Sequence, residues 1–172
     1  MKFLFGLVLG LLLVPLFLYC YLSMGLAPVA TSAPPFPFEK RITGMALHAR
    51  VDKEAPKDFP VQSTEENLAA GAHIYRTHCA VCHALPGQPQ SAIAEGMFPK
   101  PPHLFKGKGV TDDSAGETYW KVANGIRLTG MPAFEQTLGR VQVWQVSLLL
   151  AGADKLPPSV QTILRQPLPD VK

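Results

Sequence analysis

Apolar side chains run almost without interruption along the first part of the chain. No charged residue lies between Phe3 and Phe38, and the stretch from Phe3 to about Leu26 is nearly all apolar. As a helix this stretch would span roughly 36 Å at about 1.5 Å per residue, which is enough to cross a bilayer core with some tilt. Pro15 lies inside it and is tolerated in membrane helices. We therefore expect a transmembrane anchor over residues 1–27.

The charges next to this segment predict its orientation. Lys2 and the amino terminus are the positive charges nearest to it, so the positive-inside rule places the amino terminus in the cytoplasm and exports the rest of the chain. A cleaved signal peptide is the alternative, because Thr31-Ser32-Ala33 is a passable cleavage site. The apolar stretch exceeds the usual ~7–15 residues of a signal segment, which favours retention. Both interpretations predict export.

Prolines mark the next stretch, residues 28–62. They favour extended backbone and oppose a regular helix. No convincing apolar period appears between Lys40 and Asp52. We expect a Pro-rich tether or a loosely packed arm here, without a regular helix. Its prolines are Pro28, Pro34, Pro35, Pro37, Pro56 and Pro60.

Helical periodicity begins at residue 63. Ser63 with Glu66 has the spacing of a capping box, which predicts the start of a helix. Apolar and small residues then recur at helical spacing and lead directly to Cys79. These residues are Leu68, Gly71, Ala72 and Tyr75.

Two further helices are predicted nearer the carboxyl terminus. One covers Ser114 to Asn124, with a Ser114–Glu117 capping box and Gly125 after its end. The other has one apolar stripe and ends at Gly152. The residues of that stripe are Val141, Trp144, Leu148 and Ala151.

Composition argues against several classes of protein, namely nucleic-acid-binding, disulfide-rich and zinc-binding proteins. The 172 residues suffice for one modest domain besides the anchor, and the formal net charge is +3. No basic run or basic helix face is present, so nothing indicates a nucleic-acid-binding protein. Three cysteines, one of them Cys20 in the apolar run, provide neither a disulfide framework nor a four-ligand zinc site.

The remaining two cysteines form Cys79-Ala80-Val81-Cys82-His83. Two thiols three positions apart lie on roughly one helical turn, so each can form a thioether to one vinyl group of a single haem. The histidine that follows then lies beneath the iron and coordinates it. A thioredoxin-like redox pair would need a βαβ setting, and a zinc site would need two more ligands. We predict one covalent haem c on Cys79 and Cys82, with His83 as an iron ligand.

A second axial ligand is expected from the Gly130-Met131-Pro132 segment. Pro132 stiffens the backbone beside Met131, and a thioether is a soft ligand that raises the reduction potential relative to two imidazoles. Met97 and His103 are the alternatives, and a packing role is common for any methionine. The other histidines are expected at the surface, namely His48, His73 and His78.

These residues, from Ser63 to Gly152, resemble a class I cytochrome c in the order of helix, haem motif, Gly-Met-Pro loop and last helix. The resemblance implies a small all-α fold wrapped round the haem, with Gly71 of the first helix crossing Trp144 of the last. It implies a proline carbonyl on the proximal His ring, which Pro86 could supply. Tyr119 and Trp120 would line the haem crevice or pack in the core. We take residues 63–153 as this domain and 154–172 as a C-terminal extension.

If His83 and Met131 fill both axial positions, no small-molecule substrate can bind the iron, and the chain is an electron carrier rather than an enzyme. We expect redox protein partners of a respiratory chain, such as a membrane dehydrogenase or oxidase complex, on the outer, periplasmic side of a bacterial cytoplasmic membrane. One alternative is a haem subunit fixed in a larger membrane complex. Another is a gas-sensing or catalytic haem, should Met131 be labile.

Basic residues near the expected haem edge offer a docking surface, although a solvated face is the default. Such a surface predicts that electron transfer slows as salt rises. The residues are Lys100, Lys106, Lys108, Lys121 and Arg127.

Overall fold

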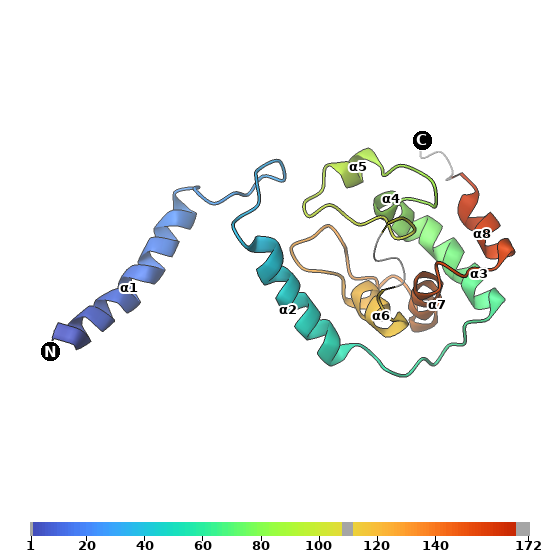
Figure 1. Cartoon of the computed structure of the whole chain (residues 1–172), viewed down its shortest axis with the longest axis horizontal. Coiled ribbons are helices and arrows are strands. Elements are labelled where there is room, and N and C mark those ends of the chain that lie inside the picture. The colour runs from blue at the N-terminus through green and yellow to red at the C-terminus, as the bar shows by residue number, and fades with distance from the viewer. Residues whose placement is uncertain (1, 108–111, 168–172) are drawn as a thin grey trace. The chain divides into compact units, whose positions relative to one another are not determined.

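The computed structural model describes residues 2–107 and 112–167 of the chain (Figure 1). Every regular element within those ranges is a helix, which confirms the expected all-α class. The chain divides into two compact units, Met1–Lys40 and Arg41–Lys172.

The first unit is dominated by α1, which spans Lys2–Ser23 and contains Pro15. It is the one helix among the described residues that is long and apolar enough to cross a membrane, judged by length and composition. Phe17 stacks on Tyr21, and Tyr21 in turn contacts the edge of Phe36 further along the chain. The helix begins and ends close to where the apolar pattern predicted.

The expectation of a stretch without regular helix is wrong for its central part, because α2 spans Glu39–Glu54. No proline lies within α2, and Pro37 and Pro56 lie just outside its two ends. Most of its residues are good helix formers. Val51 is only 2% exposed, so packing adds to this local preference.

The segment after α2 packs on helices within the same, second unit. A Cβ added to Gly116 would lie 2.0 Å from the Pro56 carbonyl oxygen, so the chain passes directly over this glycine. Phe59 then meets the ring of Trp144 edge-on, with the ring centroids 5.5 Å apart. The Pro-rich segment is therefore partly fixed to the domain that follows it.

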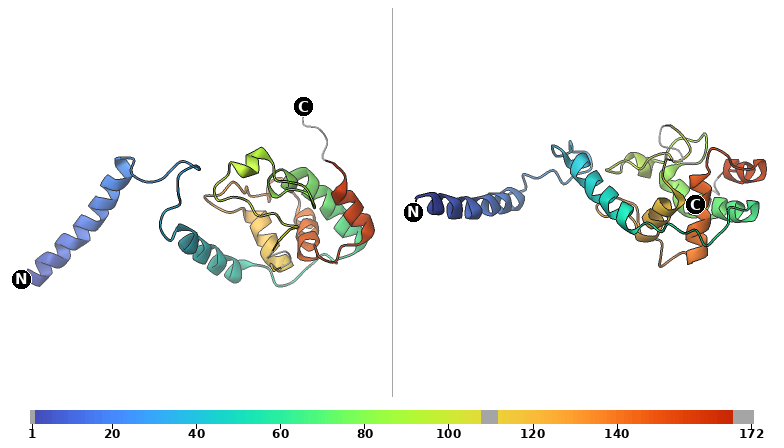
Figure 2. Two further views of the ribbon diagram at one scale, coloured as in Figure 1. Left: turned by 45° about the horizontal axis from the view of Figure 1, so that its top comes forward. Right: turned by 60° about the horizontal axis from the view of Figure 1, so that its bottom comes forward.

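The core of the second unit is built from α3 (Glu65–Ile74), α6 (Ala115–Asn124), α7 (Arg140–Ala151) and α8 (Pro158–Arg165). Helix α7 packs against both α3 and α6, and α8 packs against α3 (Figures 1 and 2). Because α7 is covered from two sides, its buried residues do not form one stripe, and Val141 of the predicted stripe is 56% exposed. The buried ones are Val143, Trp144, Val146, Ser147 and Leu149.

The crossing of α3 and α7 depends on Gly71. A Cβ at this position would lie 2.3 Å from the Gln145 carbonyl oxygen, so only a glycine lets the two backbones approach this closely. The expectation that Gly71 faces Trp144 needs correction, since its nearest neighbours belong to Gln145 and Leu149. Trp144 lies on the other side of α7 and stacks on Tyr119 of α6 at 4.3 Å.

Helix caps agree with the sequence in most places. The capping box of Ser114 and Glu117 is present, and Gly125 and Gly152 follow the ends of α6 and α7. The first cap is one residue later than expected, because the side chain of Thr64, and not Ser63, accepts a hydrogen bond from Asn67 N.

The C-terminal segment is part of this core. Val160 and Leu164 of α8 are fully buried, as expected for an amphipathic helix packed on α3. Arg76 donates to the backbone carbonyls of Ile163, Gln166 and Pro167 at the end of α8. A cation is favourable at that position because the helix dipole leaves partial negative charge there.

Candidate functional site

The Cys79–His83 motif lies where α3 continues into two short helices. The π-helical segment η1 spans Tyr75–Cys79, and α4 spans Ala80–His83. Neither motif cysteine is in a disulfide, and both are half-buried. Three positions along a helical path amount to roughly one turn, so Cys79 and Cys82 are about one turn apart and His83 follows directly.

Tyr75 fixes the turn that ends the motif. Its ring is fully buried, and its hydroxyl donates to the Ala84 carbonyl oxygen at 2.7 Å. Burial, reinforced by Cys79, raises the pKa of Tyr75, so the phenol remains a donor. Ala84 has φ 60° and ψ 167°, a conformation that costs a residue with a side chain about 1–3 kcal/mol. The surrounding contacts therefore hold a strained turn directly after His83.

The orientation of His83 is set by a carbonyl nineteen residues further along the chain. His83 Nδ1 lies 2.8 Å from the Pro102 carbonyl oxygen. Burial lowers the pKa of His83, outweighing the opposite effect of that carbonyl, so the ring is neutral. With its proton on Nδ1 and donated to Pro102, the ring leaves the Nε2 lone pair for a metal. The sequence suggested Pro86 as the source of this carbonyl, but in the structure the carbonyl belongs to Pro102.

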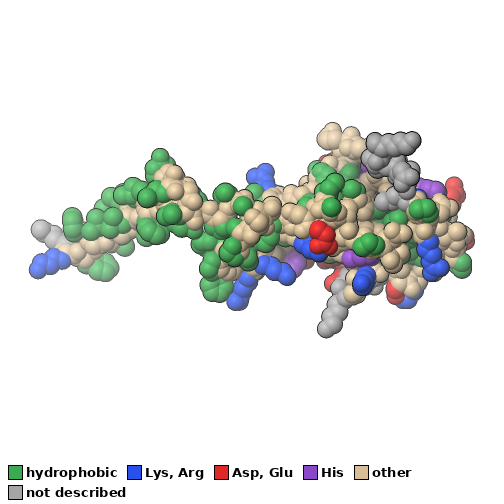
Figure 3. All heavy atoms as spheres, turned by 90° about the horizontal axis from the view of Figure 1, so that it is seen from above, with side chains coloured by type: hydrophobic (Ala, Val, Ile, Leu, Met, Phe, Trp, Pro, Cys, Tyr) green, Lys and Arg blue, Asp and Glu red, His purple; other side chains and the backbone are tan. Residues whose placement is uncertain are grey.

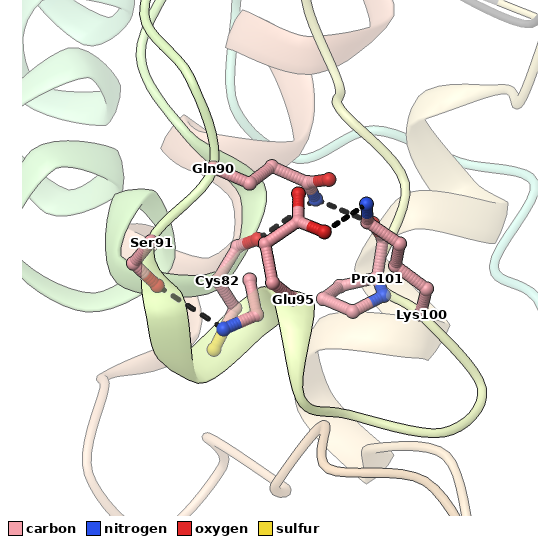
Figure 4. A network of polar contacts seen from close by, with 7 residues as sticks. Cys82, Gln90, Ser91, Glu95, Lys100 and Pro101 are labelled. Carbon is pink, nitrogen blue, oxygen red and sulfur yellow. Dashed lines mark hydrogen bonds and ion pairs between the residues drawn. The ribbon is translucent and has the colours of Figure 1, made fainter. Parts of the chain in front are cut away.

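The loop that carries Pro102 is tied back to the motif by side-chain hydrogen bonds (Figure 4). The Gln90 amide donates to the Cys82 carbonyl at 3.3 Å and to the Pro101 carbonyl at 2.6 Å, thus joining the motif to the returning loop. Ser91 Oγ donates to the Val81 carbonyl at 2.5 Å. An ion pair between Lys100 and Glu95 closes the loop at 2.6 Å.

Sequence reasoning missed Gln90 and Ser91. Ser91 had a local signal, because it is the N-cap of the short helix α5 (Ala92–Glu95) and accepts from Ala94 N at 3.2 Å. Gln90 had no such local signal. Its amide joins the carbonyls of Cys82 and Pro101, which are far apart in sequence, so no spacing pattern marks it.

Met131 lies on the loop that follows α6. Gly125 ends the helix with φ 66°, and a Cβ there would lie 2.6 Å from Ala133 N, which requires glycine at this position. Ile126 N then donates to the Met131 carbonyl at 3.2 Å. Thr129 Oγ1 donates to the Ile126 carbonyl at 2.6 Å and accepts from Met131 N at 3.1 Å. The side chain of Met131 is half-buried and packs against the hydrophobic core.

Met97, the alternative axial ligand, lies against the same loop. A Cβ on Gly130 would lie 1.7 Å from the terminal methyl of Met97, so the Met97 side chain covers this glycine. His103 is engaged elsewhere, with Nε2 3.3 Å from the Gln88 carbonyl and Nδ1 accepting from Phe105 N. Both ring nitrogens of His103 thus have protein partners, which argues against it as an iron ligand.

The other uses of a Cys-x-x-Cys pair do not fit. Burial, together with Cys82, raises the pKa of the Cys79 thiol to about 12, whereas a reactive redox cysteine needs a lowered pKa. No strand occurs in the described ranges, so the βαβ setting of a thioredoxin-like pair is missing there. The same ranges contain no group of three or more His, Cys, Asp or Glu side chains that could hold a metal ion.

The residues present do fit a haem c. Two free thiols at thioether spacing are followed by a neutral imidazole whose Nδ1 is already hydrogen-bonded. A soft thioether sulfur is available on a separate loop that packs on the same core. This donor set is the one that holds haem iron in electron-transfer proteins with Met/His ligation.

The other residues considered in the sequence are the remaining histidines, Trp120 and the basic residues, and none of them is part of the His83–Pro102 contact. His48 and His73 are exposed as expected, but His78 is half-buried with its ring 6.0 Å from that of Phe134. Trp120 donates from Nε1 to Glu54 of α2 at 3.1 Å. Of the basic residues, Lys100 and Lys121 pair with Glu95 and Asp113. Lys108 lies outside the described residues.

Residues 66–148 match the family model of cytochrome c oxidase, cbb3-type, subunit III. The matched range runs from α3 to α7 and includes Cys79, Cys82, His83, Pro102 and Met131. No curated protein matches the chain.

Proposed function

Since the chain is a c-type cytochrome, with its cytochrome domain matched over residues 66–148, we propose that it passes single electrons through one haem c bound to Cys79 and Cys82. His83 and Met131 are the proposed axial ligands. The haem would supply the one-electron couple, while the chain binds it, buries it and sets its potential. The hydrogen bond between His83 Nδ1 and the Pro102 carbonyl carries this proposal, because it gives the ring the tautomer and orientation that iron needs.

We further propose that α1 is retained as a single-pass anchor and that the cytochrome domain lies on the outer side of a bacterial cytoplasmic membrane. The length and composition of α1 support a membrane span, and the charge at Lys2 supports this orientation. In this location the domain would exchange electrons with membrane dehydrogenase or oxidase complexes of a respiratory chain, without a small-molecule substrate of its own.

The second candidate is a haem subunit fixed in a larger membrane oxidoreductase complex. The matched family is named after an oxidase subunit, which favours this role. The packing of Val51, Pro56 and Phe59 on the domain also favours it, because only residues 24–38 then separate α1 from α2. Fully extended, this linker reaches at most roughly 50 Å, which restricts how far the domain can travel from its anchor.

Absorption spectra of the purified full chain test the ligation. Oxidised protein is expected to show a sulfur-to-iron charge-transfer band, and reduced protein is expected not to change when carbon monoxide is added. Loss of the band in Met131→Ala, but not in Met97→Ala, would identify the ligand. An immediate carbon monoxide shift in the wild type would mean an open iron site and a gas-sensing or catalytic haem instead.

Co-purification separates the carrier from the fixed subunit. A mobile carrier is expected to leave a mild detergent extract as a single chain. Migration of the haem-stained band with a large membrane complex on a native gel would favour the fixed subunit.

A further inference from the structure

Helix α2 has two opposite apolar faces. One is directed to the cytochrome domain, where Val51 is 2% exposed and Glu54 accepts from Trp120. The other consists of Ile42, Met45, Ala46 and Ala49, which are all exposed. These four residues follow the i, i+3, i+4, i+7 spacing of one helix face, which we call the outer stripe. Ile42 and Met45 are 62% and 64% exposed.

Exposed apolar side chains also precede the outer stripe. Residues 24–38 contain no charge, and Leu26, Val29, Phe36 and Phe38 are all exposed large hydrophobics. Apolar side chains likewise cover α1 (Figure 3). A linker in water normally carries polar or charged residues, whereas aromatic residues are enriched where a chain lies at a membrane–water interface. The sequence therefore becomes polar only gradually after the anchor.

The charges at the border of the outer stripe complete the pattern. Arg41, Arg50 and Lys53 lie along it or beside it, together with two acidic residues, Glu39 and Asp52. Arg50 also pairs with Glu54 at 2.8 Å. Long basic side chains beside an apolar helix face can extend to lipid phosphates while the face enters the acyl boundary.

We propose that the outer stripe of α2 lies in the headgroup region of the bilayer that α1 spans, with anionic lipid phosphates against its basic border. This inference rests on the proposed retention of α1. A single interfacial contact is weak, but the linker keeps α2 close to the membrane and raises its effective concentration there. Because Glu54 of α2 accepts a hydrogen bond from Trp120 and the chain at Pro56 packs on Gly116, the lipid contact also holds the domain near the membrane surface.

Hydroxyl-radical footprinting of the full haem-loaded chain in vesicles of phosphatidylcholine and phosphatidylglycerol tests this proposal. Met45 is a built-in probe, since methionine is easily oxidised and its oxidation is read by mass spectrometry. We compare the wild type with Ile42→Glu, which puts a charge in the outer stripe. Val141→Glu is the matched control, because Val141 is a similarly exposed apolar residue on α7.

Oxidation of Met45 is expected to be several-fold slower in the wild type and in Val141→Glu than in Ile42→Glu, with unchanged haem spectra throughout. Equal and rapid oxidation of Met45 in all three proteins would overturn the proposal. So would protection of Met45 in native membranes but not in pure lipid, which would assign the outer stripe to a partner protein. Mass spectrometry of the mature chain reports separately on α1, and its absence would overturn both this inference and the proposed anchor while leaving the haem assignment intact.

Discussion

The segments that carry His83 and Met131 are stabilised by different kinds of contact. His83 ends a helical path, its Nδ1 is bonded to the Pro102 carbonyl, and Gln90 joins that loop to the motif. Met131 lies on a loop held mainly by backbone hydrogen bonds and by the Thr129 side chain. At the tip of this second loop Leu128 is 85% exposed and has φ 60°.

This difference predicts how the segments that carry His83 and Met131 respond to denaturant or mutation. The His83 segment has hydrogen bonds to distant parts of the chain and would also carry the proposed thioether attachment, so it is expected to keep its geometry under conditions that loosen the rest. The Met131 segment depends on backbone hydrogen bonds, on packing of Met131 against the core and on glycines that accept no side chain. We therefore expect ligand exchange, if it occurs, on the methionine side.

The largest expected effect separates the two ligands directly. His83→Ala removes part of the attachment motif and is expected to yield mostly chain without covalent haem. Met131→Ala keeps Cys79, Cys82 and His83, so it is expected to retain haem, lose the charge-transfer band and bind carbon monoxide when reduced. Intact-mass measurement and haem staining give the haem content of each variant. Equal loss of haem in both would contradict the asymmetry.

Gly125→Ala tests the methionine loop alone. The new Cβ would lie 2.6 Å from Ala133 N, and the φ of 66° is unfavourable for alanine, so we expect a loss of about 3 kcal/mol in the free energy of unfolding. Gly96→Ala is the matched control, because its Cβ would meet nothing closer than 3.6 Å. Denaturant titration measures both. A change of the same size in Gly96→Ala would remove the special role of Gly125.

A smaller change is expected from Thr129→Val, which removes two hydrogen bonds in the loop. We expect about 1.5 kcal/mol of local destabilisation, seen as loss of the methionine–iron band at a lower denaturant concentration. Thr162→Val removes a hydrogen bond to Pro158 within α8 and is expected to leave that band in place. If Thr129→Val lost the band at the same denaturant concentration as the wild type, the two hydrogen bonds of Thr129 would not be what stabilises the loop.

The smallest expected effect concerns the start of α6, the helix that leads into the methionine loop. Ser114 and Glu117 exchange hydrogen bonds in a capping box, so Ser114→Ala is expected to cost about 1 kcal/mol. Thermal unfolding at neutral pH measures this loss. An unchanged melting temperature would contradict it.

The same capping box predicts a dependence on pH. Hydrogen bonds from Ser114, backbone first and side chain second, hold the pKa of Glu117 below its ordinary value. A depressed pKa in the folded state contributes stability above the unfolded pKa of about 4.3, and this contribution is lost as the pH falls through the folded pKa. Glu117→Gln is therefore expected to flatten the acid limb of a stability–pH curve. An unchanged slope would mean that other carboxyl groups dominate it.

Local patterns were sufficient for much of the protein. A nearly continuous apolar run predicted α1. The spacing of Cys79, Cys82 and His83 predicts a haem motif, and the family match covers these residues. The capping box at Ser114 and the glycines after α6 and α7 correctly bounded those helices. Each of these features is encoded by residues within about one or two helical turns of each other, where side-chain spacing alone determines what they can contact.

Other features were decided only by the tertiary structure. The carbonyl on His83 is that of Pro102 rather than Pro86, because Gln90 ties the returning loop to the motif. Helix α2 and the chain around Pro56 are packed where prolines suggested a tether or a loosely packed arm, because Glu54 and Pro56 have partners distant in sequence. The choice between Met131 and Met97 as the second ligand of the proposed haem also depends on contacts between segments distant in sequence. Sequence periodicity shows which face of an element is apolar, but the partner of that face is determined by long-range packing that no local spacing records.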